Sequence, residues 1–272
     1  MNKKVVIAGC TKNSATYINE HLQKLVSVGE LFETYSIIIY ENDSSDNTLE
    51  ILSKFKKNNN NFNFVSEKNV INKIKYPNIN NRVQIICHGR NILLKIIKQY
   101  YFNYDLMIMI DLDNVLEKFN PNTILNILKY NEEWSALTAN CFGKYYDIWA
   151  LRIPSNVWNI HIHNKIWNIP IDHDCWSQII NNTHPRILIE SYQKIIPIDM
   201  PLIKTESSFG GLGIYKISKI LNSNYDCYSY DKNGNLLFIQ CEHVSFNKSI
   251  EGPKYICPSL LVLSPKEHII NY

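Results

Sequence analysis

Apolar segments of strand length alternate with segments of helical periodicity over the first half of this 272-residue chain. The residues predicted as strands are 4–9, 35–40, 62–65, 105–111 and 135–139. Helices are predicted between them at 14–28, 48–55, 82–100 and 121–130. Strands that are apolar throughout need cover on both faces, and parallel pairing needs a crossover connection of helix length. The pattern therefore predicts an α/β fold with a mainly parallel sheet flanked by helices.

The second half of the chain has a different character. The alternation ends near Asn140, and four of the five tryptophans follow that point. These are Trp149, Trp158, Trp167 and Trp176. Asn233-Gly234, between apolar residues, predicts a β-hairpin. A length of 272 residues suits one domain, and no internal repeat is present. We therefore expect a single domain over residues 1–272, with an α/β half (1–140) and an aromatic-rich half (141–272).

Composition restricts the partners and the compartment. The formal net charge of +3 is too small to indicate a nucleic acid or a membrane surface as partner. The seven cysteines are odd in number and never spaced C-x-x-C, which disfavours a zinc site or a disulfide framework and favours a reducing compartment. No signal peptide opens the chain, and no apolar run approaches the length of a membrane span. We therefore expect a cytoplasmic protein without a membrane span.

Polar clusters follow three of the predicted strands. They are "CTKN" at 10–13, "ENDSSDNT" at 41–48, and Asp111-Leu112-Asp113. In open α/β sheets, ligands bind at the carboxyl ends of the strands. Any one cluster could be a plain turn, and "ENDSSDNT" alone is equally consistent with a turn in which Asp46 or Thr48 caps a helix. Three clusters at successive strand ends indicate a binding site.

Asp111 and Asp113 are one residue apart at the exit of a buried strand, where both can turn toward one ion. Carboxylate oxygens suit Mg²⁺ or Mn²⁺, and an added imidazole shifts the preference toward Mn²⁺. The candidate imidazole is His243 in "CEHVSFN" (241–247). The alternative for His243 is a buried core histidine or a residue that caps a following helix.

Six segments, in order, resemble motifs of GT-A glycosyltransferases. "YENDSSDNT" resembles the motif after their second strand, "HGRN" (88–91) their A-R-N motif, and "IDLD" their D-x-D metal motif. The later segments are most similar to the fungal capsule-associated mannosyltransferase-like group: "YYDIWALR" (145–152), "SSFGGLGIYK" (207–216) and "CEHVSFN". The resemblance spans most of the chain between Val5 and Asn247.

The resemblance implies a GT-A (Rossmann-like) fold, with a nucleotide-binding half at 1–140 and a sugar- and acceptor-binding half at 141–272. It implies transfer of a hexose from a nucleotide-sugar donor, GDP-mannose or a UDP-hexose, to a hydroxyl of a glycan or glycoprotein acceptor. It also implies that Asp111, Asp113 and His243 hold Mn²⁺ or Mg²⁺.

Particular residues acquire roles from the same resemblance. Glu41 and Asp43 would contact the base or ribose, Arg90 the nucleotide or its phosphates, and Trp149 would be a stacking platform for sugar. Gly210 and Gly211 would let the backbone approach the donor sugar. The full set expected to contact the donor is Thr11, Lys12, Asn13, Glu41, Asp43, Arg90, Asp111, Leu112, Asp113, Trp149, Arg152, Gly210 and Gly211.

The sequence does not single out a catalytic base. Glu206, Asp174 and Asp147 are the candidates, with Asp172 and Glu242 also open, so the stereochemical outcome is open too. Two other interpretations stand beside the transferase. "DLDNVL" also resembles the first motif of haloacid-dehalogenase-type phosphatases, in which Asp111 would be the nucleophile, although that motif usually lies on the first strand. The chain could also be a non-catalytic glycan-binding module that kept the fold.

Overall fold

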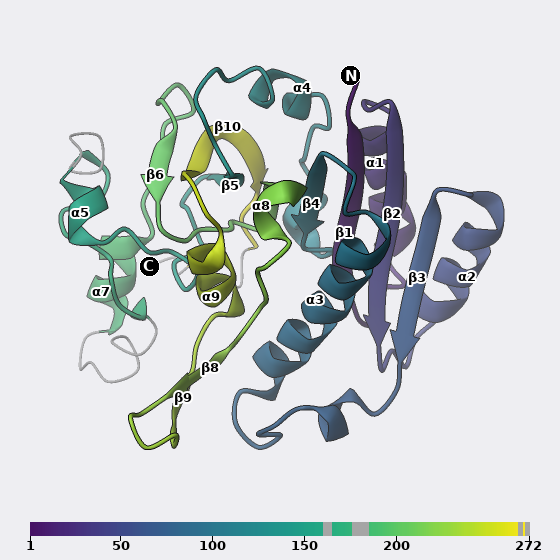
Figure 1. Cartoon of the computed structure of the whole chain (residues 1–272), viewed down its shortest axis with the longest axis horizontal. Helices are drawn as coiled ribbons and strands as arrows, with labels where there is room; N and C mark the ends of the chain where they lie inside the picture. The colour runs from purple at the N-terminus through teal and green to yellow at the C-terminus, as the bar shows by residue number, and fades with distance from the viewer. Residues whose placement is uncertain (160–164, 176–184, 266–268, 270–272) are drawn as a thin grey trace.

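The computed structural model describes residues 1–159, 165–175, 185–265 and 269. Within them, one sheet has eight strands in the order β3-β2-β1-β4-β7-β5-β10-β6, and β8 and β9 pair separately (Figure 1). The strands are β1 Lys4–Thr11, β2 Thr34–Asn42, β3 Phe62–Glu67, β4 Leu106–Ile110, β5 Ala136–Phe142, β6 Ile203–Thr205, β7 Leu212–Lys216, β8 Tyr228–Tyr230, β9 Leu236–Ile239 and β10 Lys254–Leu263.

Helices connect and cover these strands. The α-helices are α1 Ile18–Gly29, α2 Thr48–Asn58, α3 Asn81–Tyr100, α4 Thr123–Ile127, α5 Ser155–Trp158, α7 Pro185–Tyr192, α8 Ile217–Ile220 and α9 Glu242–Ser249. Two short 3₁₀ helices are η1 Val70–Lys73 and η2 Asn114–Leu116. None of the described helices is both long enough and apolar enough to cross a membrane.

The sheet is mainly parallel, as the sequence predicts. β3, β2, β1 and β4 run parallel to one another, and β5 runs parallel to β10. β7 is inserted antiparallel between β4 and β5, and the edge strand β6 is antiparallel to β10. β7 is not predicted from the sequence, because it lies after the alternation of strands and helices has ended and within the glycine-containing segment "SSFGGLGIYK".

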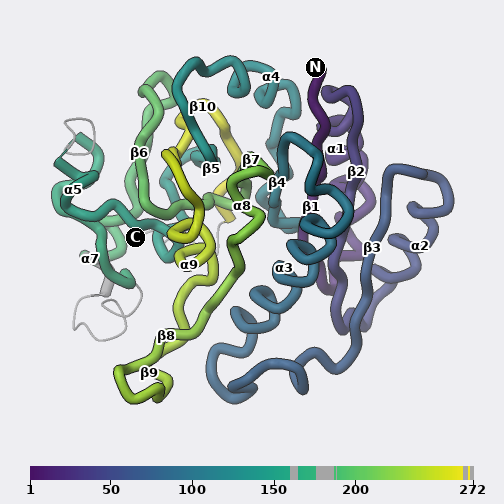
Figure 2. Tube along the Cα trace, in the orientation of Figure 1, coloured from purple at the N-terminus to yellow at the C-terminus, as the bar shows by residue number. Residues whose placement is uncertain are grey.

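Both faces of the sheet are buried, because successive residues of a strand point to opposite sides. On β1, Val5 and Ile7 pack in the core beneath α1, whereas Val6 and Ala8 pack in the core beneath α3. Figure 2 shows the two helices on opposite sides of β1 and β2. This arrangement explains why the parallel strands are apolar throughout.

Two helices differ from their predicted bounds. α1 begins at Ile18 instead of Ser14, and Ser14 links the end of β1 to the start of α2. The Ser14 amide donates to Thr48 Oγ1 at 2.8 Å, and its hydroxyl pairs with Thr11 Oγ1 at 2.5 Å. α4 covers only 123–127 of the predicted 121–130. The hairpin predicted at Asn233-Gly234 is confirmed as β8–β9, with Gly234 at φ 83°.

Gly89 lets α3 pack closely on the sheet. A Cβ at this position would lie 2.4 Å from Cδ1 and 2.6 Å from Cε1 of the Tyr40 ring, well inside van der Waals contact. Tyr40 is on β2 and is almost fully buried, so its ring has little room to move. The close approach brings the next residue, Arg90, over the carboxyl end of the sheet.

We predict that Gly89→Ala destabilises the protein by about 1–3 kcal/mol, the usual cost of overpacking a core. Helix propensity alone would favour alanine at this position, so a loss of stability must come from the contact with Tyr40. Denaturant unfolding measures the effect, with Lys95→Ala at an exposed position of the same helix as control. A Gly89→Ala protein as stable as the control would contradict the proposed packing.

Candidate functional site

The three predicted polar clusters meet at one edge of the sheet. β1 ends at Thr11, β2 ends at Asn42 and β4 leads into Asp111, and these strands are parallel neighbours. Hydrogen bonds join the first two clusters directly. The Asn13 amide donates to Ser44 Oγ at 2.9 Å, and the Ser45 amide donates to Asn13 Oδ1 at 2.8 Å. The clusters therefore form a single polar edge, with Lys12 exposed at its rim.

Glu41 is fully buried at this edge. Its Oε1 accepts from the Ser44 amide at 2.8 Å, and its Oε2 accepts from the Ser66 hydroxyl of β3. The carboxylate thus holds the loop after β2 against β3. Any contact of Glu41 with a nucleoside has to use the lone pairs that these two donors leave.

The other two acidic residues of the loop also bind backbone amides. Asp43, in the left-handed region at φ 49°, accepts from the amides of Asn69 and Val70. Asp46 accepts from the amide of Thr48, the first residue of α2, and from the amide of Ala15. The N-cap of α2 is Asn47 and not Asp46 or Thr48, although Asp46 binds the first amide of the helix. The loop as a whole is fixed by its own carboxylates.

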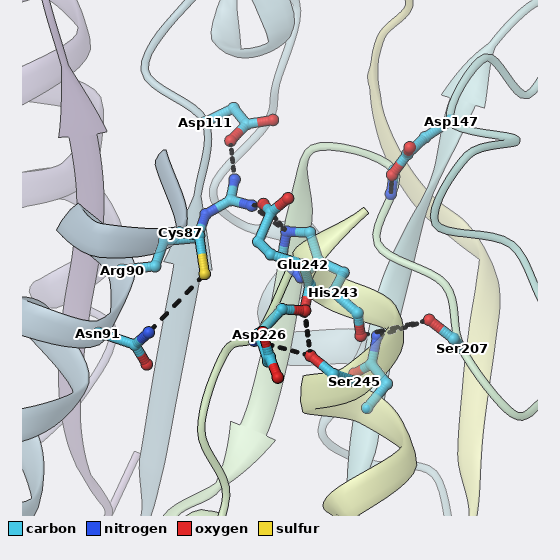
Figure 3. A network of polar contacts seen from close by, with 12 residues as sticks. Cys87, Arg90, Asn91, Asp111, Asp147, Ser207, Asp226, Glu242, His243 and Ser245 are labelled. Carbon is cyan, nitrogen blue, oxygen red and sulfur yellow. Dashed lines mark hydrogen bonds and ion pairs between the residues drawn. The ribbon is translucent and has the colours of Figure 1, made fainter. Parts of the chain in front are cut away.

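Arg90 lies at the centre of the site, between three structural elements (Figure 3). Its Nη2 donates to Asp111 Oδ1 at 2.6 Å. Its Nη1 donates to Glu242 Oε1 and to His243 Nε2, which belong to the first two residues of α9. One guanidinium therefore connects α3, the end of β4 and the start of α9.

Aromatic rings cover the same guanidinium. Its Cζ lies 5.0 Å from the centroid of Phe209 and 5.9 Å from that of Tyr225. Burial works to lower the pKa of Arg90, but Glu242 and Asp111 outweigh it and raise that pKa well above its usual value. Neither Phe209 nor Tyr225 was predicted as a site residue; Phe209 lies inside the quoted "SSFGG", whereas Tyr225 stands outside every motif.

His243 has a different partner from the predicted metal ion. Its Nε2 faces Arg90, and its ring stacks on Phe209 at 3.7 Å between centroids. Burial, and then the charge of Arg90, lower the pKa of His243 well below its usual value, so the ring is neutral. Because an arginine can only donate, Nε2 must accept and the ring proton sits on Nδ1. In this arrangement Nε2 could reach a metal ion only if Arg90 released it, whereas Nδ1 is buried without a hydrogen-bond partner.

Exposure differs sharply among the four side chains of this cluster. The relative exposure is 6% for Arg90, 7% for Glu242 and 2% for His243, but 31% for Asp111. A ligand that enters from solvent therefore meets Asp111 first, with Arg90 behind it. Burial raises the pKa of the Asp111 carboxyl, Arg90 opposes this, and Asp113, Asp147 and Glu242 add to it.

The carboxylates at the end of β4 fit one kind of metal site. Asp113 accepts from the Val115 amide at 3.1 Å through Oδ1, which fixes its side chain at the start of η2. Within the described residues, no three His, Cys, Asp or Glu side chains are grouped so as to hold a metal ion. Mg²⁺ and similar ions are often held by one or two carboxylates and completed by substrate phosphates. Asp111 and Asp113 fit such a site, and Leu112 between them is buried against Gly9.

Gly210 and Gly211 pack the segment before β7 against the same edge. Both have left-handed φ angles, 67° and 86°. A Cβ on Gly210 would lie 2.4 Å from the Ala139 carbonyl oxygen, and one on Gly211 would lie 2.7 Å from Val115 Cγ1. The Asp111 amide donates to the Gly211 carbonyl at 2.9 Å. The glycines are therefore required by protein contacts, and their predicted approach to a donor sugar stays a prediction.

The candidate bases occupy three different places. Asp147 is beside the site: it accepts from the Gly210 amide at 2.9 Å, and burial raises its pKa. Asp174 accepts from Trp149 Nε1 at 3.0 Å, so these two predicted residues form a pair of their own. Glu206 is more exposed and lies 3.3 Å from Lys248 Nζ.

Arg152 and Trp167 make hydrogen bonds to backbone carbonyls within the second half of the chain. Arg152 is buried and donates to the carbonyls of Trp149 and Leu151. Trp167 is fully buried and donates to the Tyr192 carbonyl. Trp176 lies outside the described residues.

All seven cysteines carry free thiols.

A second polar cluster, absent from the sequence predictions, lies at the ends of β2 and β3. Glu67 accepts from Tyr40 Oη at 2.8 Å, from His88 Nε2 at 2.7 Å and from Lys73 Nζ at 2.5 Å. Burial would raise the pKa of the Glu67 carboxyl, but these hydrogen bonds outweigh it and lower the pKa to about 2. His88, inside "HGRN", was the available sequence signal for this cluster.

The chain has the fold of the GT-A glycosyltransferases. No family model matches the sequence, and a search of curated proteins gives no match. Among solved structures, the fold is similar to that of the mannosyltransferase PcManGT from Pyrobaculum calidifontis in complex with GDP-Man and Mn²⁺. The TM-score is 0.50 at 10% identity, over 98% of this chain and 58% of that one.

Two further solved structures are similar at lower scores. S. aureus TarS (residues 1–349) in complex with UDP-GlcNAc has a TM-score of 0.45 at 14% identity, over 95% of this chain and 57% of that one. Glucosyl-3-phosphoglycerate synthase from Mycobacterium tuberculosis, with Mn²⁺, UDP and phosphoglyceric acid, has a TM-score of 0.40 at 10% identity, over 80% and 57%. The chain thus spans less than three-fifths of the length of these proteins.

We predict that Glu67→Gln lowers stability at neutral pH and that this loss shrinks in acid. The folded-state pKa of about 2 lies below the usual 4.5, so the stabilising ionised form is lost as the pH falls from about 4.5 toward 2. Thermal unfolding of both proteins between pH 7 and pH 3 measures the difference in melting temperature. A difference that stays constant, or widens in acid, would show that Glu67 is not held ionised by its three donors.

Proposed function

We propose that the protein is a metal-dependent glycosyltransferase that moves a hexose from a nucleotide-sugar donor to a hydroxyl of a glycan or glycoprotein acceptor. The observation that carries the proposal is the position of Asp111 and Asp113, which follow a buried central strand of a GT-A sheet. At this position they share an edge with the loops after β1 and β2, where ligands bind in open α/β sheets.

The donor would lie along this edge. Thr11, Lys12 and Asn13 from the first loop, with Glu41 and Asp43 from the second, would surround the nucleoside. Because hydrogen bonds already fix both loops, the nucleoside would bind to a preformed surface at little cost in conformational entropy. Asp111 and Asp113 would hold Mn²⁺ or Mg²⁺ at the diphosphate.

The chemistry requires stabilisation of negative charge. When the bond between sugar and phosphate breaks, the departing diphosphate gains charge, and a bound divalent cation would stabilise it there. Arg90 lies directly behind Asp111 and adds a permanent positive charge to the same region. The buried position of Arg90 among aromatic rings strengthens that interaction, because less water screens it.

The acceptor would enter from the second half of the chain. Trp149 would be the stacking surface for a sugar ring, with its indole held by Asp174. Of the candidate bases, Asp147 is the one whose charge acts on Asp111, and burial raises its pKa, which is the direction that favours a proton acceptor. Asp174 and Glu206 stay as candidates on the acceptor side.

The donor and the location are inferred from the later motifs and from the cysteines. The motifs of the second half resemble the capsule-associated mannosyltransferase-like group, and PcManGT was solved with GDP-Man. These favour GDP-mannose, with a UDP-hexose as the alternative. The seven free thiols favour a cytoplasmic location.

We predict that Asp111→Asn and Asp113→Asn each abolish Mn²⁺-dependent binding of nucleotide sugar while the fold is kept. A neutral amide is a much poorer ligand for a hard cation than a carboxylate. The measurement is a thermal-shift screen of GDP- and UDP-sugars with Mn²⁺ and with EDTA, in which ligand at 100 times its Kd should stabilise the wild type by about 2.7 kcal/mol. Asp199→Asn, at an exposed position, is the matched control.

Normal Mn²⁺-dependent binding by both variants would mean that the metal site is misassigned. The same proteins separate the alternative functions. A phosphatase that uses Asp111 would hydrolyse an aryl phosphate and form an aspartyl-phosphate, whereas a transferase does neither. A non-catalytic glycan-binding module would be stabilised by oligosaccharide and not by nucleotide sugar.

A further inference from the structure

The structure joins His243 to the donor site through another residue. His243 is almost fully buried, and the path from its Nε2 toward Asp111 is occupied by the Arg90 guanidinium. Figure 3 shows Arg90 between Asp111 on one side and Glu242 and His243 on the other. The imidazole and the exposed carboxylate therefore contact the same side chain and not each other.

We propose that Arg90 is the positioning residue of the donor site, and that His243 acts on the site by holding Arg90 and not by ligating the metal ion. The proposal rests on the donor site assigned above and deepens it. Arg90, Glu242 and His243 together fix the direction of the Asp111 carboxylate before a metal–diphosphate arrives.

The first support is that the two oxygens of the Asp111 carboxylate lie in different surroundings. The hydrogen bond from Arg90 goes to Oδ1 at 2.6 Å, and the other oxygen is directed away from the guanidinium. Without this bond, the side chain at the strand end could rotate and leave both oxygens without a fixed direction. The hydrogen bond from Arg90 to one oxygen also fixes the direction of the other oxygen. This preorganisation lowers the entropy cost of binding a metal–diphosphate.

The second support is the way Arg90 itself is fixed. Its Nη1 has two acceptors on α9, Glu242 and His243, and the rings of Phe209 and Tyr225 lie close to the guanidinium. Arg90 uses two separate nitrogens for the two sides, whereas a lysine has all of its donors on a single nitrogen and does not reproduce this geometry. His243 is suited to this role, since its Nε2 faces a group that can only donate and therefore accepts from it.

The third support is the close packing that sets the position of Arg90. Gly89 allows α3 to touch Tyr40, and the stacked Phe209 and His243 rings both contact the guanidinium. A displacement of Arg90 toward solvent would leave Glu242 buried without its partner, which is strongly unfavourable. Arg90 is thus held in place before any ligand binds.

The test compares His243→Gln, His243→Ala and Arg90→Lys, with Arg82→Lys on the exposed part of α3 as control. Mn²⁺ affinity without nucleotide is measured from the EPR signal of free Mn²⁺, and affinity for GDP and UDP is measured at saturating Mn²⁺. Thermal unfolding in EDTA establishes that each variant is folded at the temperature of the binding experiments. His243→Gln replaces the imidazole nitrogen by an amide oxygen that can still accept from Arg90.

We expect His243→Gln to bind Mn²⁺ and nucleoside diphosphate within about twofold of the wild type. His243→Ala and Arg90→Lys should bind the diphosphate about tenfold more weakly, the effect of losing one charge-assisted hydrogen bond. Arg82→Lys should not differ from the wild type. If Arg90→Lys does not fold, the diphosphate affinity of His243→Ala is compared with that of the wild type instead.

Two results would overturn the inference while leaving the proposed function intact. One is a wild-type affinity for diphosphate in Arg90→Lys or, where that variant does not fold, in His243→Ala. The other is a loss of tenfold or more in Mn²⁺ affinity in His243→Gln, which would make His243 a direct ligand. If the wild type binds neither GDP nor UDP with Mn²⁺, the proposed function fails and the inference falls with it.

Discussion

The site depends on the ion pairs that the buried guanidinium of Arg90 makes with Asp111 and Glu242. A charge removed from water is costly unless it is paired, and Arg90 is paired with carboxylates from two elements that are far apart in sequence. The pairing imposes a geometry: α3, the end of β4 and the start of α9 must meet at one point. The close contact of Gly89 with Tyr40 makes this meeting possible, because any side chain there would push α3 off the sheet.

Around this point the chain uses its polar residues in two ways. The carboxylates of Glu41, Asp43 and Asp46 are turned inward to backbone amides and make the loop after β2 rigid. Asp111 is partly exposed and turned outward, with Asp113 held beside it at the start of η2. A rigid edge with exposed carboxylates is suited to a charged ligand that brings its own counter-ion, as a metal-bound diphosphate does.

The sequence predicts the first half of the fold well, because its strands are apolar throughout and its helices are amphipathic, and both signals are local. It misses β7, whose place between β4 and β5 depends on pairing across more than 100 residues of chain. The resemblance places Asp111, Asp113 and Arg90 at one donor site, and the structure brings Arg90 into contact with Asp111. It does not predict that His243 faces Arg90, because that contact joins residues 153 apart and depends on how α9 docks. Tyr225 could not be predicted from any local pattern, since only the tertiary fold places its ring near Arg90.

The most direct test of the central claim is a calorimetric titration of GDP and of UDP into the wild-type protein, with saturating Mn²⁺ and again with EDTA. A site made by Asp111 and Asp113 at the end of β4 predicts that at least one of the two nucleotides binds with Mn²⁺ and that binding is lost or greatly weakened in EDTA. Absence of binding to both nucleotides in Mn²⁺, or equal binding in EDTA, would contradict a metal–diphosphate site at this edge of the sheet.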